Sequence, residues 1–271
     1  MHWPSEDLWL AIAPQVPGFS VEVLPTIDST NTELMRRARA GQTDPVLLVA
    51  EQQTAGRGRM GRQWQSQAGD SLTFSLGMNL APADWSGLSL AIGWAITHAL
   101  DPEQGLGLGL KWPNDVWVMG AASDQPRKLA GILVETASAA SGPSAPTQAR
   151  YCVMGVGINL KAPAGTNNPI APIGLLALDP QCTPASVLMC VAQPLVETVL
   201  AFERQGFAPF QARFHARDVL RGQAVTLSDG QAGVAQGVSS TGELLLAQGD
   251  RLIKVHSAEV SVRPSALKAA G

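Results

Sequence analysis

The order of apolar and polar residues predicts a chain in which strands alternate with a few helices. Short apolar or alternating runs are typical of strands, and longer runs with a 3.6-residue repeat are typical of helices. The predicted strands cover residues 45–50, 71–80, 106–110, 128–135 and 151–158. The predicted helices cover residues 34–39, 88–100 and 184–205. The run at 88–100 is too short to span a bilayer, so it is interpreted as a buried helix.

Local signals refine these boundaries. Thr30 and Glu33 have the spacing of a capping box, and Gly41 is a typical helix stop. Pro194 predicts a kink or break in the long helix. The strands at 128–135 and 151–158 look like a hairpin pair, and the residues between them, 136–149, are rich in Ala, Ser and Pro and predict an exposed loop. Glycines alternate with leucines over residues 105–110, which indicates that another group approaches that strand closely.

The pattern of apolar runs and turn residues changes after about Asp218. Short apolar runs then alternate with turn signals such as Ser228-Asp229-Gly230, which is typical of a small all-β barrel. These runs cover residues 224–227, 232–238, 243–247, 252–255 and 260–262. We therefore predict a boundary near residues 215–220, with one domain at 1–217 and a second at 218–271.

Composition excludes several classes of protein. The chain has 271 residues, 45% of them hydrophobic and 15% charged, which predicts a folded core. A net charge of -3 argues against a general nucleic-acid binder. Cys152, Cys182 and Cys190 form no CxxC pair, so neither a zinc site nor a disulfide framework is expected. The first residues do not read as a secretory signal, and a cytoplasmic protein without a membrane segment is predicted.

The most informative segment is a loop rich in glycine and arginine at residues 51–64. Gly56, Gly58 and Gly61 match G-x-G-x-x-G, but a dinucleotide-binding fold requires a helix directly afterwards, and residues 62–70 have no helical apolar stripe. The alternatives are a mobile loop whose arginines bind carboxylate or phosphate oxygens, and a solvated basic turn. For this loop alone the second is the more frequent case.

Three further segments carry candidate chemistry. They are Lys111-Trp112-Pro113-Asn114-Asp115, the apolar strand that starts at Lys128, and the glycine-flanked end of a strand at Asn159. Each segment alone is more often structural: a capped strand end, a snorkelling edge lysine and a turn, respectively.

Taken together and in this order, these segments resemble bacterial biotin–protein ligases. The resemblance rests on Ser29-Thr30-Asn31, Gln53, Gly56-Arg57-Gly58-Arg59, Trp64, Lys111-Trp112-Pro113-Asn114-Asp115, the run from Lys128 to Glu135, and Gly155-Val156-Gly157-Ile158-Asn159. It covers roughly residues 20–265. It implies an α+β fold like that of class II synthetases and biotin–lipoate ligases, in which helices flank a mixed sheet that precedes a small SH3-like barrel.

The resemblance also implies roles for individual residues. The implied biotin site comprises Ser29, Thr30, Asn31, Gln53, Gly56, Arg57, Arg59, Trp64, Lys128 and Gly131. The implied ATP site comprises Arg59, Arg62, Trp64, Asn114, Asp115, Lys128, Asn159 and Arg263. The implied catalytic residues are Lys128, Arg59, Arg57, Lys111 and Asp115, and no protein metal site is expected. Trp64 corresponds to an aromatic that closes over the ligand.

The implied enzyme activates biotin with ATP and Mg²⁺ as biotinyl-5'-AMP, releases pyrophosphate, and transfers biotin to one lysine of a biotin carboxyl carrier protein. A homodimer is compatible with this family. Some members carry an N-terminal helix-turn-helix, but only about 20 residues precede the match, so we expect no DNA binding. The extra residues at 119–125 and 136–149 affect local geometry and any dimer interface.

Three alternatives are less consistent with these segments. Lipoate or octanoate ligases share the architecture but lack this loop of glycines and arginines. A non-catalytic biotin sensor would not need the full set of charged positions. An oxidoreductase on a dinucleotide-binding fold would need a helix after Gly61.

Overall fold

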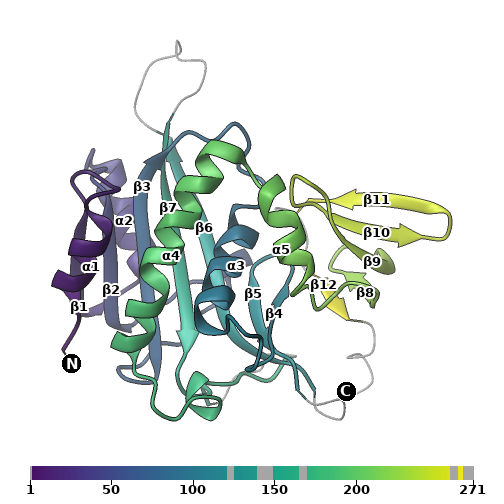
Figure 1. Ribbon diagram of the computed structural model, residues 1–271, viewed down its shortest axis with the longest axis horizontal. Coiled ribbons are helices and arrows are strands. Elements are labelled where there is room, and N and C mark those ends of the chain that lie inside the picture. The colour runs from purple at the N-terminus through teal and green to yellow at the C-terminus, as the bar shows by residue number, and fades with distance from the viewer. Residues whose placement is uncertain (1, 121–124, 139–148, 165–169, 257–261, 265–271) are drawn as a thin grey trace.

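Two β-sheets form the framework of the computed structural model, which describes residues 2–120, 125–138, 149–164, 170–256 and 262–264 (Figure 1). The larger sheet has seven strands in the order β1-β2-β3-β7-β6-β5-β4. Its strands are β1 (Ser20–Ile27), β2 (Val46–Gln53), β3 (Ser71–Leu80), β4 (Leu108–Lys111), β5 (Asp115–Val118), β6 (Arg127–Ser138) and β7 (Arg150–Asn159). Only β1 and β2 pair in parallel; the other neighbours are antiparallel. This sheet is mixed, as predicted.

The second sheet is small, antiparallel and built from the C-terminal part of the chain. Its order is β11-β10-β9-β8-β12. The strands are β8 (Ala224–Leu227), β9 (Ala232–Val238), β10 (Leu244–Gln248), β11 (Arg251–Val255) and β12 (Val262–Pro264). Four of the five predicted runs correspond to β8, β9, β10 and β11. The fifth, at 260–262, shares only Val262 with β12, and its other two residues lie outside the described part. The sheet fits the predicted SH3-like domain.

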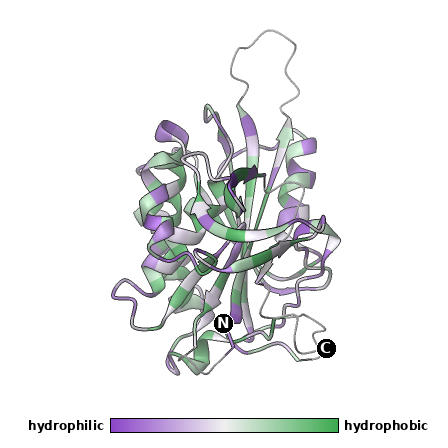
Figure 2. Ribbon diagram, turned by 90° about the vertical axis from the view of Figure 1, so that its right-hand side faces the viewer, coloured by the Kyte–Doolittle hydropathy of each residue, from purple (hydrophilic) through white to green (hydrophobic). Residues whose placement is uncertain are grey.

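Helices cover both faces of the larger sheet, which Figure 2 shows edge-on between them. They are α1 (Ser5–Ile12), α2 (Thr30–Arg39), α3 (Leu88–Leu100), α4 (Pro184–Gln205) and the short α5 (Gln211–His215). Helices α1, α3 and α4 bury their apolar side chains with one face of the sheet in the main core, while Leu34 and Met35 of α2 form a smaller core on the opposite face. The α+β fold is therefore confirmed.

Helix α4 is long and apolar enough to cross a membrane by length and composition. Ten of its residues are nevertheless buried within the fold, and it packs against α3, α1 and β3. It begins with a capping box at Thr183 and Ser186, and it continues through Pro194 without the break that this residue predicted. Its apolar stripe therefore belongs to the core of the domain.

Several predicted boundaries need correction. The cap of α2 is Ser29, whose Oγ accepts a hydrogen bond from the Thr32 amide at 3.4 Å, and not a box at Thr30 and Glu33. Strand β6 continues to Ser138, so 136–138 are not part of a loop; residues 139–148 lie outside the described part. The close approach predicted for the glycine-rich strand comes from the chain itself, since a Cβ on Gly109 would lie 2.2 Å from Val219. Helices α1 and α5 and strands β1 and β5 were not predicted.

The two sheets meet at the end of β4. The Leu110 amide donates to the Arg217 carbonyl at 2.7 Å, and the Val219 amide donates to the Leu110 carbonyl at 3.1 Å. The Trp112 side chain is fully buried, and its indole Nε1 donates to the Gly242 carbonyl in the turn before β10 at 3.0 Å. The small sheet therefore contacts the Lys-Trp-Pro-Asn-Asp segment directly.

Candidate active site

One face of the large sheet is polar although it is buried. Ser71, Thr73 and Ser75 alternate along β3 with apolar residues and are at most 5% exposed. Because successive side chains of a strand point to opposite faces, these three hydroxyls share one face. The main core occupies the other face. Buried polar side chains need partners, so a row of them indicates a site rather than a core.

Glycines open space on this face next to the hydroxyls. Gly155 pairs with Ser75, and Gly157 pairs with Thr73 on one side and with Gly131 on the other. A Cβ on Gly155 would lie 2.1 Å from Asn31 Oδ1, and one on Gly157 would lie 2.4 Å from the Trp64 ring. Side chains from α2 and the glycine–arginine loop therefore lie directly on the backbone of the sheet.

The N-terminus of α2 supplies a buried hydrogen-bonded pocket. The Thr30 amide and Oγ1 both donate to Gln53 Oε1, at 2.8 and 3.1 Å. Ser75 Oγ lies 2.7 Å from Thr30 Oγ1 and 2.6 Å from Asn31 Oδ1. A hydroxyl has one proton, so Ser75 donates to one of these oxygens at a time. The pocket therefore contains amide and hydroxyl groups that can exchange partners with a bound polar ring.

A carboxylate links this pocket to the glycine–arginine loop. Asn31 Nδ2 donates to Glu135 Oε2 at 2.9 Å, and Arg57 forms an ion pair with Glu135 Oε1 at 3.1 Å. The loop itself is a narrow hairpin in which Arg57 pairs with Gln63, and the Trp64 amide donates to the Gly56 carbonyl at 2.9 Å. No α-helix follows Gly61; only the short 3-10 turn Arg59–Gly61 precedes the extended chain. The dinucleotide-binding interpretation is excluded by this geometry.

Cations gather at the other end of the polar face. Lys128 Nζ donates to Asp115 Oδ1 at 2.6 Å and lies 5.8 Å from the Trp64 ring centroid. Arg59 Nη1 donates to Asn114 Oδ1 at 3.3 Å. Burial lowers the pKa of Arg59, while Asp115 opposes and Arg62 reinforces this effect. Several cations thus surround one carboxylate, which favours a bound anion.

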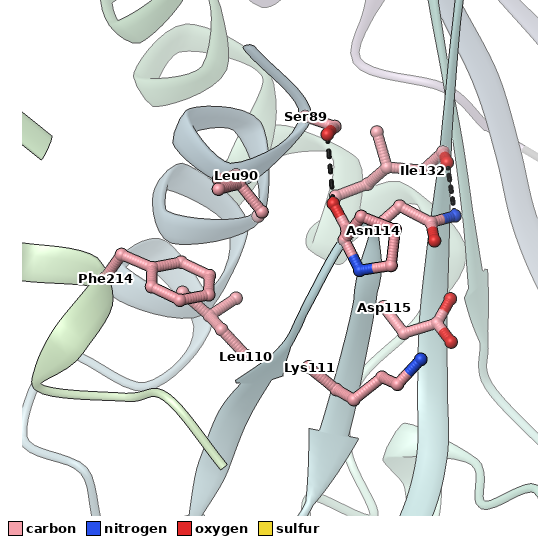
Figure 3. A pocket seen from close by; sticks show the side chains of 10 residues that line it. Ser89, Leu90, Leu110, Lys111, Asn114, Asp115, Ile132 and Phe214 are labelled. Atoms are coloured by element: carbon pink, nitrogen blue, oxygen red, sulfur yellow. Dashed lines mark hydrogen bonds between the residues drawn. The ribbon is translucent and has the colours of Figure 1, made fainter. Parts of the chain in front are cut away.

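Lys111 is the most buried member of this cluster. It is 7% exposed and lies opposite Asp115 in the register of β4 and β5. Burial lowers the pKa of its ammonium group to about 8; Asp115 raises this pKa, and Lys128, Arg59 and Arg62 lower it. Figure 3 shows the ammonium pointing toward the Asp115 carboxylate.

The described residues contain no cluster of three or more His, Cys, Asp or Glu side chains that could hold a metal ion. Asn114 and Asp115 are adjacent and offer oxygen atoms. Mg²⁺ prefers oxygen ligands and is commonly held by one or two carboxylates together with substrate phosphates. These residues therefore fit an ion that arrives with a nucleotide.

The structure brings most of the predicted residues together on this face. Ser29, Thr30, Asn31, Gln53, Gly56, Arg57, Trp64 and Gly131 lie around the amide pocket, and Arg59, Lys111, Asn114, Asp115, Lys128 and Asn159 lie toward the cations. Arg62 is exposed on the loop. The backbone of Arg263 pairs with Thr226 in the small sheet, and its side chain lies outside the described part.

Two contributors were not predicted from the sequence. Ser75 joins Thr30 to Asn31, and Glu135 joins Asn31 to Arg57. The polar alternation of Ser71, Thr73 and Ser75 in an otherwise apolar strand was a signal that could have identified the first. Glu135 belongs to the recognised lysine strand but was assigned no role.

Replacing Gly155 with alanine is expected to displace Asn31 and to weaken binding of the ligand of the amide pocket at least about tenfold. Overpacking should also reduce the free energy of unfolding by about 1–3 kcal/mol. Titration calorimetry and urea unfolding measure the two effects. Gly105→Ala is the matched control, because a Cβ there meets nothing within 4 Å. Equal binding by both variants would show that Asn31 does not shape the pocket.

Comparison with known proteins identifies relatives of this chain. Residues 23–159 match the Biotin/lipoate A/B protein ligase family, and residues 220–263 match the Biotin protein ligase C terminal domain. The chain is 34% identical over 264 residues to the Bifunctional ligase/repressor BirA of Escherichia coli, an alignment that covers 93% of this chain and 77% of that protein. It is 31% identical to the Biotin--[acetyl-CoA-carboxylase] ligase of Mycobacterium tuberculosis, over 89% of this chain and 88% of that one.

A solved structure extends the likeness to the whole fold. The biotin protein ligase from Aquifex aeolicus, in complex with biotin and ATP, superposes with a TM-score of 0.71 at 26% identity, over 90% of this chain and 99% of that chain. One family model matches the part of the chain that forms the larger sheet, and the other matches the part that forms the small sheet. The resemblance inferred from the sequence is confirmed. The chain belongs to the biotin protein ligase family.

Proposed function

We propose that this chain is an ATP-dependent biotin–[acetyl-CoA-carboxylase] ligase. It activates biotin as biotinyl-5'-AMP with release of pyrophosphate, and then transfers biotin to one lysine of a biotin carboxyl carrier protein. One observation carries the proposal: a buried amide–hydroxyl pocket and a cluster of cations share one sheet face, with Trp64 and Lys128 between them.

The amide pocket suits the ureido ring of biotin. This ring offers one carbonyl acceptor and two N–H donors, and a buried site built for such groups excludes analogues that lack them. Thr30, Asn31 and Gln53 supply matching donors and acceptors, and Ser75 fixes their orientation. The fatty-acid chains of lipoate or octanoate would leave these groups unpaired.

The cation cluster suits the adenylation step. The biotin carboxylate must attack the α-phosphorus of ATP, and two anions 4 Å apart repel each other by about 4 kcal/mol at an effective dielectric constant of 20. Lys128, Arg57 and Arg59 would supply fixed positive charge where negative charge accumulates. A carboxylate oxygen of biotin forms a bond to the α-phosphorus. The bond between this phosphorus and the oxygen that bridges to the β-phosphate breaks, and pyrophosphate leaves with its electron pair.

On the nucleotide side, Asn114, Asp115 and Asn159 would contact ATP, with Arg62 and Arg263 as further predicted contacts. A magnesium ion bound with ATP would offset phosphate charge, and the oxygens of Asn114 and Asp115 would hold it. The glycine–arginine loop would close over the anhydride and keep water from hydrolysing it. A side chain at Gly56 would collide with the Trp64 carbonyl at 2.3 Å, so the loop needs glycine there.

The second step is aminolysis of the anhydride by the carrier lysine. The neutral amine attacks the biotinyl carbonyl, the amide bond forms, and AMP leaves as the bond to its phosphate oxygen breaks. The amine must lose a proton before it attacks, and Asp115 would receive that proton or direct its transfer, with Lys111, its partner in the β4–β5 register, as the second candidate. No nucleophilic side chain of the enzyme takes part.

The proposal predicts labelling of a single lysine. Purified chain, ATP, Mg²⁺, biotin and a biotin carboxyl carrier domain should give a carrier heavier by one biotinyl group. A carrier with its target lysine replaced by arginine should stay unmodified. A chain that modifies neither carrier, although the wild-type carrier is labelled by another ligase, would contradict the proposal.

Several narrower features remain predictions of this proposal. They are the boundary between residues 217 and 218, a cytoplasmic location, the absence of DNA binding, and a homodimer. Arg217 and Val219 still bond to Leu110 of β4, and the small sheet starts at Ala224, which supports a boundary in this region.

A further inference from the structure

Lys111 presents an energetic problem that the proposed reaction does not explain. The residue as a whole is only 7% exposed, and within the part of the chain that the structure describes no hydrogen bond or ion pair is found for its ammonium group. The nearest aromatic ring, that of Trp117, has its centroid 5.9 Å from Nζ. An unpartnered buried charge costs several kcal/mol, so such a group is retained only where something compensates it.

Among the described residues, two other charged side chains are as strongly buried, and they show the contrast. Arg217 and Asp101 are 8% and 3% exposed and form an ion pair at 3.4 Å, and Arg217 also donates to the Leu108 carbonyl at 3.0 Å. Their charges are satisfied within the fold. Lys111 has no such ion pair in the described part of the chain; the charge of Asp115 acts on its ammonium without direct contact.

Asp115 is the group that faces Lys111. The two residues are direct partners in the β4–β5 register, so their side chains leave the same face of the hairpin, and Figure 3 shows them pointing toward one another. Asp115 instead bonds to Lys128, at 2.6 Å, and its side chain is 15% exposed. One partly buried carboxylate therefore lies between two lysines but is paired with one of them.

This pairing holds Lys128 away from its proposed substrate. To neutralise the biotin carboxylate and the α-phosphate, Lys128 must turn its ammonium from Asp115 toward the bound anions. Leaving a partly buried carboxylate unpaired would oppose that movement. Arg59 is engaged with Asn114 on the same side.

We infer that Lys111 is a positioning residue: it replaces Lys128 as the ion-pair partner of Asp115 when the Lys128 ammonium turns toward the anionic substrates. Asp115 then remains paired throughout, and Lys128 is released at low energetic cost. In the adenylation step Lys111 contacts no reacting atom; it acts through Asp115. The inference rests on the proposed adenylation function.

The test is a double-mutant cycle with Lys111→Met and Asp115→Asn. Methionine keeps the length of the side chain and removes its charge. Single-turnover formation of biotinyl-AMP, at saturating biotin, ATP and Mg²⁺, should fall about 10- to 100-fold in Lys111→Met. In the Asp115→Asn background no carboxylate holds Lys128, so adding Lys111→Met should change the rate less than about threefold.

Two more variants separate a positioning role from other roles. Lys111→Arg keeps a cation that cannot transfer a proton at neutral pH, and it should retain most of the single-turnover rate. Lys254→Met, which removes an exposed lysine of the small sheet, should leave the rate unchanged. Lys111→Met should also unfold at a higher urea concentration than wild type, because an unpartnered buried charge has been removed.

The outcomes discriminate clearly. A similar loss on adding Lys111→Met in both backgrounds, or no loss in either, would overturn the inference. No loss in either background would mean that the Mg²⁺ which the proposed function assigns to Asp115 offsets its charge without Lys111. A Lys111→Arg variant as slow as Lys111→Met would overturn it in favour of proton transfer. If wild type itself forms no biotinyl-AMP, the proposed function fails and the inference with it.

Discussion

Replacing Lys128 with alanine is expected to slow formation of biotinyl-AMP by about 10²- to 10³-fold while the chain stays folded. Lys128 is the cation between the amide pocket and the proposed nucleotide site, 5.8 Å from the Trp64 ring centroid. Without it, the attack of one anion on another loses its fixed counter-charge. The loss corresponds to about 3–4 kcal/mol of transition-state stabilisation.

The measurement is single-turnover adenylation monitored by mass, with circular dichroism to confirm the fold. Lys161→Ala is the matched control, because Lys161 is an exposed lysine that forms a surface ion pair with Asp70. Adenylation at the wild-type rate in Lys128→Ala would remove Lys128 from the site. Equal losses in both lysine variants would point to a general effect of charge.

Replacing Arg59 with glycine is expected to make the site leak its intermediate. Arg59 bridges the loop to Asn114, and charge-assisted hydrogen bonds of this kind contribute about 1.5–3 kcal/mol. Losing them should speed release of biotinyl-AMP by about 10- to 100-fold. The released anhydride should then biotinylate exposed lysines of a bystander protein such as serum albumin.

Met60→Gly is the control for this second prediction. Met60 is exposed, lies in the same loop, and has a positive φ of 56° that glycine adopts readily. It therefore adds a glycine to the loop without removing a charge. Strict selectivity and full activity in Arg59→Gly, or equal leakage in both variants, would show that Arg59 does not retain the intermediate.

Much of the fold was predictable because long segments carry a clear period. Strand β3 and helix α3 begin and end where the apolar pattern placed them. Short elements were not predicted, because the four residues of β5 and the five of α5 are too few to show a hydrophobic period. The cap of α2 was misplaced by one residue because Ser29 and Thr30 are both good capping residues and only the backbone angles select Ser29.

The site was predictable where it is local in sequence. Arg57, Arg59, Lys111 and Lys128 each lie in a compact motif, and the structure brings them to one face. Contacts that depend on strand register were not predictable: Asn31 and Glu135 are 104 positions apart and meet because β6, β7 and α2 lie together.

The proposed site should activate biotin in preference to other carboxylic acids. The most direct test mixes the purified chain with ATP and Mg²⁺ and with biotin, lipoate or octanoate in separate reactions, and measures pyrophosphate and acyl-adenylate by mass. We expect biotinyl-AMP and pyrophosphate with biotin and neither product with the two fatty acids. An adenylate formed from lipoate or octanoate, or no adenylate from any acid in a demonstrably folded protein, would contradict this claim.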